Sequence, residues 1–367
     1  MSFICQFIQL GRPQIRFVWL SLFFIVLGSV FVLYQTQPFY ITILPPLINH
    51  LYPTDFPSLY KNLVLLSCSS DSYTSIYCYY LPFTALAWRR IGFEPIIFLV
   101  GSNEKFAKMP LINFLKNDLK IEYHIINVDS SRSISLSQMI RLFGGFFSYD
   151  FNTTKDYFIM TSDADLLPIT RSRYEIVRNH TNYILAVNAY CCPSDKFSYG
   201  DFHNIRYYPI SYIGMEQGLW KKLFLPLNNC SISSNITVDM IECCLKEKMK
   251  VSLPKNVIKG TKQWDIDQRF ISLLIAQAER FYGTYVDKRS RGSRLDPNKE
   301  FLSSDFNSIL GYHDVHLPNQ HENIIYSNRT WLVLKNAFSY LFNNDTMELL
   351  SRYHYQTVAS VFTQRKS

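Results

Sequence analysis

The sequence predicts a Rossmann-like α/β fold, in which a mostly parallel central sheet is covered by helices on both faces. Two observations predict this arrangement. Short apolar runs alternate along the chain with longer helical stretches, so each connection between two runs has room for a crossover helix. The apolar runs also lack a regular alternation with polar residues, which is typical of strands that are buried on both faces of a parallel sheet.

The predicted elements follow one another from residue 61 onward. Strands are expected at Leu63–Cys68, Pro95–Val100, Ile121–Val128 and Asp156–Met160, and helices near Thr74–Arg90, Glu104–Asn117 and Leu136–Phe147. After the first strand the chain has Ser67-Cys68-Ser69-Ser70-Asp71 and no Gly-x-Gly-x-x-Gly motif. The sequence therefore argues against a dinucleotide cofactor.

The composition indicates a folded protein that binds an anionic substrate. Charged residues make up 18% of the chain and aromatic residues 16%, so the chain is built to pack rather than to stay disordered. With 367 residues it can bury a sizeable core without a disulfide scaffold. The formal net charge of +8 is spread without a Lys/Arg block, which favours an anionic substrate over nucleic acid.

An apolar segment near the N-terminus predicts one transmembrane helix, from Phe17 to Tyr34. Arg12 and Arg16 precede this segment, so the positive-inside rule keeps residues 1–16 in the cytosol and sends the rest across the membrane. A cleaved signal peptide is the alternative, but no small-x-small cleavage site follows. The expected order is a cytosolic tail (1–16), a signal anchor (17–34), a stem (35–60) and a lumenal domain (61–367).

Sequons and cysteines agree with a lumenal domain. All the Asn-x-Ser/Thr sequons lie beyond the apolar segment, at Asn152, Asn179, Asn229, Asn235, Asn328 and Asn344. Of the 8 cysteines, Cys5 would be cytosolic, so an odd number remains for the oxidising lumen and at least one stays unpaired within the monomer. The vicinal pair Cys191-Cys192 is a candidate for cross-links to the 230–244 segment. A zinc site is the alternative, but the cysteine spacing does not favour it.

Two carboxylates, Asp163 and Asp165, directly follow the fourth predicted strand. The carboxyl end of a central parallel strand lies at the ligand crevice of such a sheet. Carboxylates at that position are hard oxygen ligands for Mg²⁺ or Mn²⁺, and the metal ion in turn neutralises a diphosphate leaving group. The alternative is a turn in which one of the two aspartates caps the next helix.

The segments Ser137–Phe143 and Asp156–Leu166, which include Asp163-Ala164-Asp165, resemble the helix and the Asp-x-Asp strand of the GT-A nucleotide-sugar glycosyltransferases. The resemblance implies a GT-A fold for the lumenal domain, over roughly residues 61–320 by pattern. It also implies a metal-dependent transfer of a sugar from a nucleotide-diphosphate donor, expected to be a UDP-sugar, to a glycan or glycoprotein. Such an enzyme would be a type II membrane protein of the Golgi or, alternatively, of the endoplasmic reticulum.

The same resemblance implies roles for residues around the acidic motif. Asp165 would bind Mn²⁺ or Mg²⁺ directly, and Asp163 would contact the donor's ribose or the water shell of the metal. Arg141 would face the nucleotide, although a solvated helix charge is the alternative. A downstream histidine is implied as the third metal ligand; His313 and His316 both stay open, and His316 is favoured.

The acceptor side is expected around a helix that opens at Trp264. Its apolar residues recur at helical spacing, at Phe270, Leu273, Leu274, Ala278 and Phe281. GT-A enzymes often present an acidic residue or an Asp-Gln pair at this point, so Asp265 or Asp267, with Gln268, is expected to face the sugar and the acceptor hydroxyl. Asp267 is favoured as the catalytic base because it lies on the core-facing side. Helix capping is the alternative role for both aspartates.

Two further segments are candidates for substrate contacts. Arg294, together with Arg289 and Arg291, lies in a Gly/Ser-containing loop and is expected to close over the pyrophosphate. The aromatic run Tyr207–Met215, followed by Trp220, is expected near the acceptor, since aromatic faces stack on sugar rings.

Two other functions are alternatives to this one. Haloacid-dehalogenase-like phosphatases also use Asp-x-Asp after a strand, but they require Thr or Val where this chain has Leu167. A non-catalytic lumenal binding or scaffolding protein that kept the fold is the alternative from a different class, and the intact Asp-Ala-Asp motif argues against it.

Overall fold

The computed structural model describes residues 61–71, 75–147, 157–176, 182–190, 196–225, 230, 236–290, 292–295, 306–318 and 327–364. All of them belong to one compact unit, Tyr52–Ser367. The predicted cytosolic tail (1–16), signal anchor (17–34) and stem (35–60) lie outside the described residues. Among the helices of the described ranges, none is both long enough and apolar enough to cross a bilayer.

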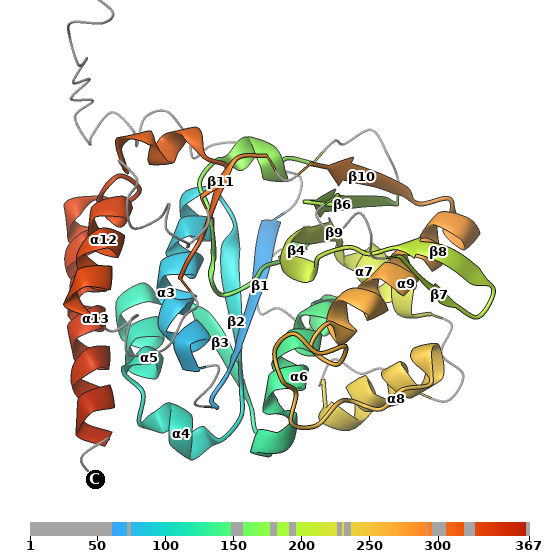
Figure 1. Cartoon of the computed structure of the whole chain (residues 1–367), viewed down its shortest axis with the longest axis horizontal. Helices are drawn as coiled ribbons and strands as arrows, with labels where there is room; N and C mark the ends of the chain where they lie inside the picture. The colour runs from blue at the N-terminus through green and yellow to red at the C-terminus, as the bar shows by residue number, and fades with distance from the viewer. Residues whose placement is uncertain are drawn as a thin grey trace, which may run out of the picture. The chain divides into compact units, whose positions relative to one another are not determined.

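A seven-stranded mixed sheet lies at the centre of this unit (Figure 1). Its strands are β1 (Lys61–Ser69), β2 (Glu94–Val100), β3 (Glu122–Ile126), β4 (Tyr157–Thr161), β6 (Tyr183–Val187), β9 (Ile213–Glu216) and β10 (Tyr285–Arg289). They lie in the order β10-β6-β9-β4-β1-β2-β3. Every neighbouring pair is parallel except the two that involve β9, which is antiparallel to β4 and β6. The expected mostly parallel sheet is confirmed, with β9 as the exception.

Helices cover both faces of the sheet, as expected (Figure 1). One face carries α3 (Ser75–Arg90), α4 (Asn103–Ala107), α5 (Pro110–Asn113), α12 (Asn328–Ser339) and α13 (Asn344–Gln364). The other face carries α6 (Ser130–Ile140), α7 (Gln217–Phe224), α8 (Val238–Met249) and α9 (Ile266–Tyr282). In β1 the buried residues Val64 and Leu66 pack in the first core, whereas Leu63 and Leu65 pack in the second. This strand reads as a continuous apolar run because both of its faces are buried.

Two smaller sheets accompany the large one. The strands β5 (Leu166–Pro168), β11 (Arg294–Leu295) and β12 (Asp314–His316) form a three-stranded sheet. The hairpin strands β7 (Lys196–Tyr199) and β8 (Phe202–Arg206) pair with each other. In the antiparallel pairing of β12 with β5, His316 lies opposite Leu166. The residue next to Leu166 is Asp165, so this register brings a distant histidine to the acidic motif.

Two predicted helices have different boundaries in the structure, and one predicted core residue is exposed. The helix expected at Glu104–Asn117 is divided into α4, α5 and a π-helical turn, Phe114–Leu119. It breaks before Pro110, because Met109 is extended and a proline disfavours helical geometry in the residue before it. The helix expected at Leu136–Phe147 begins earlier, at Ser130, and continues as a 3-10 helix, Arg141–Phe146. In α9, the predicted core residue Phe281 is 62% exposed.

Disulfides join Cys68 to Cys78 and Cys230 to Cys243. The expected link from Cys191-Cys192 to the 230–244 segment is therefore not made through Cys230 or Cys243. Both Cys191 and Cys192, as well as Cys5, lie outside the described residues. Cys244 is a buried free thiol, and burial raises its pKa to about 12. A neutral buried thiol of this kind is chemically inert.

Candidate active site

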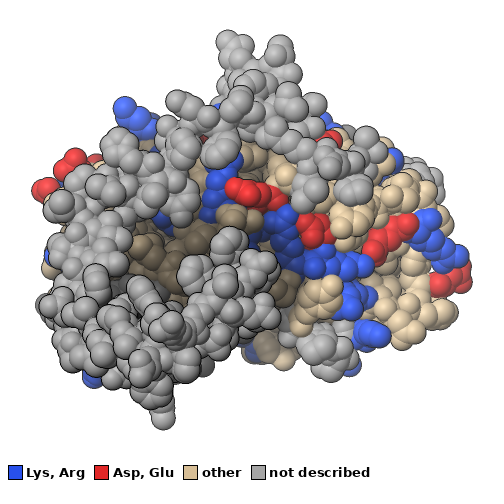
Figure 2. Space-filling model, turned by 90° about the horizontal axis from the view of Figure 1, so that it is seen from above, with Lys and Arg blue, Asp and Glu red and all other residues tan. Residues whose placement is uncertain are grey.

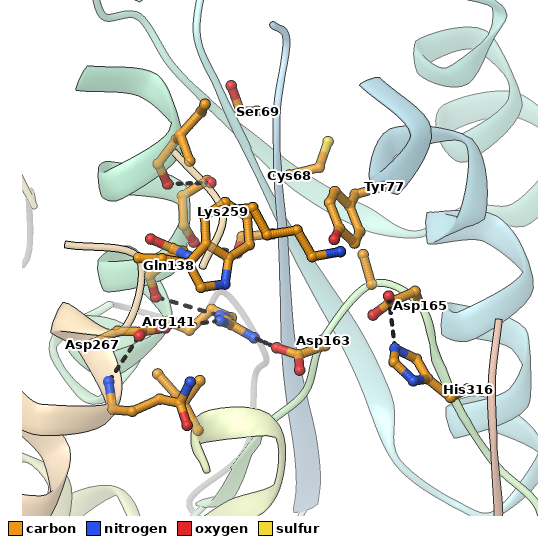
Figure 3. A pocket seen from close by; sticks show the side chains of 17 residues that line it. Cys68, Ser69, Tyr77, Gln138, Arg141, Asp163, Asp165, Lys259, Asp267 and His316 are labelled. Carbon is orange, nitrogen blue, oxygen red and sulfur yellow. Dashed lines mark hydrogen bonds and ion pairs between the residues drawn. The ribbon is translucent and has the colours of Figure 1, made fainter. Parts of the chain in front are cut away.

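A cavity of about 240 Å³ lies at the carboxyl ends of β1 and β4, between these strands and the helices α6 and α9 (Figure 3). From β1 the chain runs to β2 and β3 on one side, whereas β4 pairs with the other side of β1. The strand order therefore reverses between β1 and β4. Open α/β sheets bind their ligands at this reversal, outside the carboxyl ends of the strands.

The acidic motif contributes both of its aspartates to the cavity wall. Asp165 is 3% exposed, and its Oδ2 atom lies 3.0 Å from Nε2 of His316. Burial by itself would lower the pKa of His316, but the adjacent Asp165 carboxylate outweighs it and raises that pKa above its ordinary value. Of the two candidate histidines, His316 lines the cavity, whereas His313 bonds Ser293 and is not part of the cavity wall.

Arg141 lies in the cavity wall and bridges two carboxylates. Its Nη1 atom donates to Oδ1 of Asp163 at 2.6 Å, and its Nη2 atom donates to Oδ2 of Asp267 at 3.4 Å. Arg141 is 5% exposed, so the alternative of a solvated helix charge is wrong. It starts the 3-10 helix Arg141–Phe146, which continues α6 and points the guanidinium at the end of β4.

The two carboxylates that share Arg141 have opposite pKa shifts. Burial acts to raise the pKa of Asp163, but the Arg141 charge and hydrogen bonds from Arg141 and Ser211 outweigh it and hold this pKa below its ordinary value. Burial raises the pKa of Asp267 to about 7 in spite of Arg141, and the nearby Asp163 charge contributes to the rise. A pair of acids whose pKa values are pushed apart is typical of sites that use one acid as a fixed charge and the other for proton transfer.

The donor atoms of Asp165 and His316 fit a divalent cation, because carboxylate oxygen and imidazole nitrogen are both metal ligands. Asp163 is already engaged, since its Oδ1 accepts from Arg141 and its Oδ2 accepts from Ser211 at 2.7 Å. The described residues contain no group of three His, Cys, Asp or Glu side chains that could hold a metal ion. Asp165 and His316 fit as a two-residue set that leaves further positions to phosphate oxygens and water.

The start of α9 separates the two candidate bases. Asp267 is 2% exposed and lines the cavity together with Gln268. Asp265 is the N-cap residue of α9 and is not part of the cavity wall. Its backbone carbonyl accepts from the Tyr207 hydroxyl at 3.3 Å, and its carboxylate accepts from Gln268 at 3.4 Å. This arrangement agrees with the choice of Asp267 over Asp265 as the candidate catalytic base. Asp265 contacts Tyr207 and Gln268 but does not itself line the cavity.

The predicted pyrophosphate-binding arginines lie elsewhere. Arg294 forms an ion pair with Asp314, with its Nε atom 2.6 Å from Oδ1, and does not line the cavity. Arg289 donates to the backbone carbonyls of Arg173 and Glu175 and pairs with Asp287. Arg291 lies outside the described residues. Neither described arginine is therefore presented to a ligand in the cavity.

The aromatic run expected at the acceptor side is mostly core. Tyr208 and Tyr212 are buried, and Trp220 is fully buried in α7, where its Nε1 atom donates to the Ile159 carbonyl at 3.0 Å. Within the run, Ile210 lines the cavity and Ser211 reaches Asp163. The run therefore packs beside the acidic motif, and the aromatic side chains named here are buried in the core and not exposed to a sugar.

Two further residues of the cavity wall, Tyr77 and Lys259, were not among the candidates chosen from the sequence. Tyr77 lies in the first turn of α3, next to Cys78, which a disulfide joins to Cys68 in β1. Lys259 lies in the connection between α8 and α9, which has no helix or strand of its own. The length of that connection was the available signal, because long structureless connections in compact domains are usually functional.

No protein-family model matches the sequence, and no curated protein matches it. Among solved structures, galactosyltransferase LgtC in complex with donor and acceptor sugar analogues is 11% identical, with a TM-score of 0.41, over 79% of this chain and 99% of that chain. The inositol-1-phosphate CTP transferase from T. maritima is 11% identical, with a TM-score of 0.33, over 81% and 98%. Mouse xyloside xylosyltransferase 1 is 9% identical, with a TM-score of 0.31, over 70% and 97%. These likenesses are too distant to decide what the present chain does.

Proposed function

We propose that the chain is a metal-dependent glycosyltransferase that moves a sugar from a nucleotide-diphosphate donor, a UDP-sugar, to a glycan or glycoprotein. The observation that carries the proposal is the convergence of Asp163, Asp165 and His316 on one cavity at the strand-order reversal of the sheet. Asp163 and Asp165 come from the end of β4 and His316 from β12. Carboxylates at that place suit a ligand that carries phosphate and metal.

In this proposal, different residues of the cavity wall act on the leaving group and on the acceptor. Asp165 and His316 would hold Mn²⁺ or Mg²⁺, which when bound supplies positive charge to the departing diphosphate. Arg141 is a positioning residue, because it holds Asp163 by one carboxylate oxygen while Ser211 holds the other. Asp163 then presents a fixed negative charge to the donor's ribose or to water around the metal site.

Asp267 is the residue proposed to receive the proton of the acceptor hydroxyl. It lies in the cavity wall, and its pKa of about 7 allows it to exchange a proton near neutral pH. Gln268 lies next to it in the wall and offers an amide to the hydroxyl groups of the donor sugar. The side chain of Asp265 does not reach this wall and takes no part in the proposed reaction.

The deciding experiment is a screen of nucleotide sugars with the full chain, in which released nucleoside diphosphate is measured with Mn²⁺, with Mg²⁺ and with a chelator. We expect metal-dependent release from a UDP-sugar, and loss of that release in Asp165→Asn. Asp201→Asn is the matched control, because Asp201 is exposed on the β7–β8 hairpin. The melting temperature of each variant separates lost chemistry from lost folding. Wild-type chain that releases no nucleoside diphosphate from any donor would favour the non-catalytic binding protein.

We also infer a type II arrangement in the Golgi membrane, with residues 61–367 in the lumen, from the apolar segment 17–34 and the sequons. Asn344 offers a direct test, because its side chain is exposed at the start of α13. In membranes from expressing cells, Asn344→Gln should migrate faster than the wild type before endoglycosidase treatment and at the same position after it. An unchanged mobility of the wild type on treatment would contradict a lumenal domain.

A further inference from the structure

The cavity wall contains three basic side chains with different surroundings, Arg141, His316 and Lys259. Arg141 is held between Asp163 and Asp267, and His316 is held by Asp165. Lys259, by contrast, makes no hydrogen bond or ion pair with any other residue of the described ranges. In Figure 3 its side chain extends from the α8–α9 connection into the cavity, toward Tyr77.

The connection that carries Lys259 is fixed to α6 a few residues earlier. The Asn256 N–H donates to the Ser131 carbonyl at 2.6 Å, and the Ser135 hydroxyl donates to the Pro254 carbonyl at 2.6 Å. Leu253 and Val257 are buried on either side of these bonds. The connection is thus docked as far as Val257, and Lys259 follows as an exposed residue at the cavity rim.

An exposed lysine contributes little to the packing of a connection, so its place at the cavity is better explained by a ligand. The three carboxylates of the wall, Asp163, Asp165 and Asp267, are already bound by Arg141 or His316, so an anionic ligand is the partner that the cavity leaves for Lys259. A lysine ammonium binds phosphate as a point charge. The arginines expected for that task, Arg289 and Arg294, are engaged by other residues outside the cavity.

We propose that Lys259 binds the diphosphate of the donor nucleotide. The inference rests on the proposed function, since it assumes that a nucleoside diphosphate occupies this cavity. It adds a binding residue from a segment that has no part in the acidic motif, and it assigns the α8–α9 connection to the donor site. Arg141 and His316 remain free to hold their carboxylates while Lys259 meets the anionic charge of the ligand.

The test compares UDP with uridine, which lacks the phosphates, by calorimetric binding to the full chain in the presence of Mn²⁺. Lys259→Ala should weaken UDP binding by about 10-fold or more and leave uridine binding unchanged, because only UDP carries the charge that Lys259 meets. Lys259→Arg should retain most of the UDP affinity. Lys262→Ala is the matched control, since Lys262 is an exposed lysine of the same connection that does not line the cavity, and it should leave both affinities unchanged.

The outcomes separate this inference from the proposed function. UDP binding that is unchanged in Lys259→Ala, or that falls together with uridine binding, overturns the role of Lys259 and leaves the proposed function in place. An equal loss in Lys262→Ala also overturns it, because the effect would then come from general surface charge. A wild-type chain that binds no nucleoside diphosphate rejects both the proposed function and the role of Lys259. Unchanged melting temperatures show that each variant is folded.

Discussion

The Nε2 atom of His316 lies 3.0 Å from Oδ2 of Asp165, although 151 positions separate the two residues in the chain. Strand pairing creates this contact, because β12 lies antiparallel to β5 with His316 opposite Leu166. A backbone hydrogen bond of 2.7 Å from the Leu317 N–H to the Asp165 carbonyl extends the same pairing. The raised pKa of His316 means that a proton and a metal ion compete for this pair.

Replacement of His316 should weaken metal binding. In His316→Gln we expect the Mn²⁺ concentration for half-maximal release of UDP to rise by at least about 10-fold, because one of two protein ligands is lost. His313→Gln is the control, since His313 bonds Ser293 and does not line the cavity. Direct calorimetric titration with Mn²⁺ should show the same difference. Equal effects of the two substitutions would argue against His316 as a ligand.

The pH dependence of the reaction should follow Asp267. A base must be deprotonated to accept a proton, so with a pKa of about 7 the rate of sugar transfer should fall as the pH is lowered through 7. Asp267→Asn should lower the rate constant by about 100-fold or more and remove this dependence. Asp265→Asn should retain both the rate and the pH profile. A wild-type profile that stays flat between pH 6 and 8 is incompatible with Asp267 as the base.

Loss of Arg141 should destabilise the fold. Arg141→Met leaves two carboxylates without their shared cation, and removal of one partner from a buried ion pair costs about 3–5 kcal/mol of unfolding free energy. The double variant Arg141→Met/Asp267→Asn should recover part of this loss, because the amide needs no counter-charge. Urea denaturation measures both values.

Arg132→Met provides the control for that experiment on the same helix. Arg132 pairs with Asp129 at the surface of α6, with 29% of its side chain exposed, so its loss should cost less than about 1 kcal/mol. Equal destabilisation by the two arginine substitutions, or no recovery in the double variant, would show that the effect of Arg141 does not come from its ion pairs with Asp163 and Asp267.

His354 should make the fold sensitive to acid. It is fully buried, its ring stacks on Trp331, and burial lowers its pKa to about 4. An unfolded histidine binds its proton near pH 6.5, so between these values the unfolded chain binds more protons and stability falls as the pH falls. The difference corresponds to a loss of up to about 3 kcal/mol between pH 6.5 and 4.

The measurement is the unfolding free energy of wild type and His354→Gln across this pH range. The glutamine variant should be less stable at neutral pH and should lack this part of the acid dependence. His203→Gln serves as the control, because His203 is exposed on β8. If the two variants lose stability in parallel with the wild type as the pH falls, His354 is not the group responsible.

Much of the fold could be predicted from local pattern. The uniform apolar run in β1 indicated burial on both faces, and Leu63 and Val64 indeed pack in opposite cores. The position of Asp163 and Asp165 after a buried strand was sufficient to predict a ligand crevice, because parallel strands all end at the same edge. Helix boundaries were harder, since Pro110 divides one expected helix and α6 begins before its apolar residues.

The candidate site depended on contacts that no local pattern encodes. From the sequence, both Arg294 and Arg141 were candidates for binding a ligand. In the structure, Arg294 forms an ion pair with Asp314. Arg141 instead forms ion pairs with Asp163 and Asp267. From the sequence, Trp220 could contact the acceptor sugar or lie in the hydrophobic core. Its full burial in the structure shows that it belongs to the core.

Strands, helices and the edge of the sheet that binds a ligand follow from periodicities of two and 3.6 residues, which are properties of neighbouring residues. The choice of His316 over His313, of Asp267 over Asp265, and the arrival of Lys259 in the cavity depend on strand register and on where long connections dock. These are long-range pairings, whose free energy comes from residues far apart in the chain, so only the tertiary structure decides them.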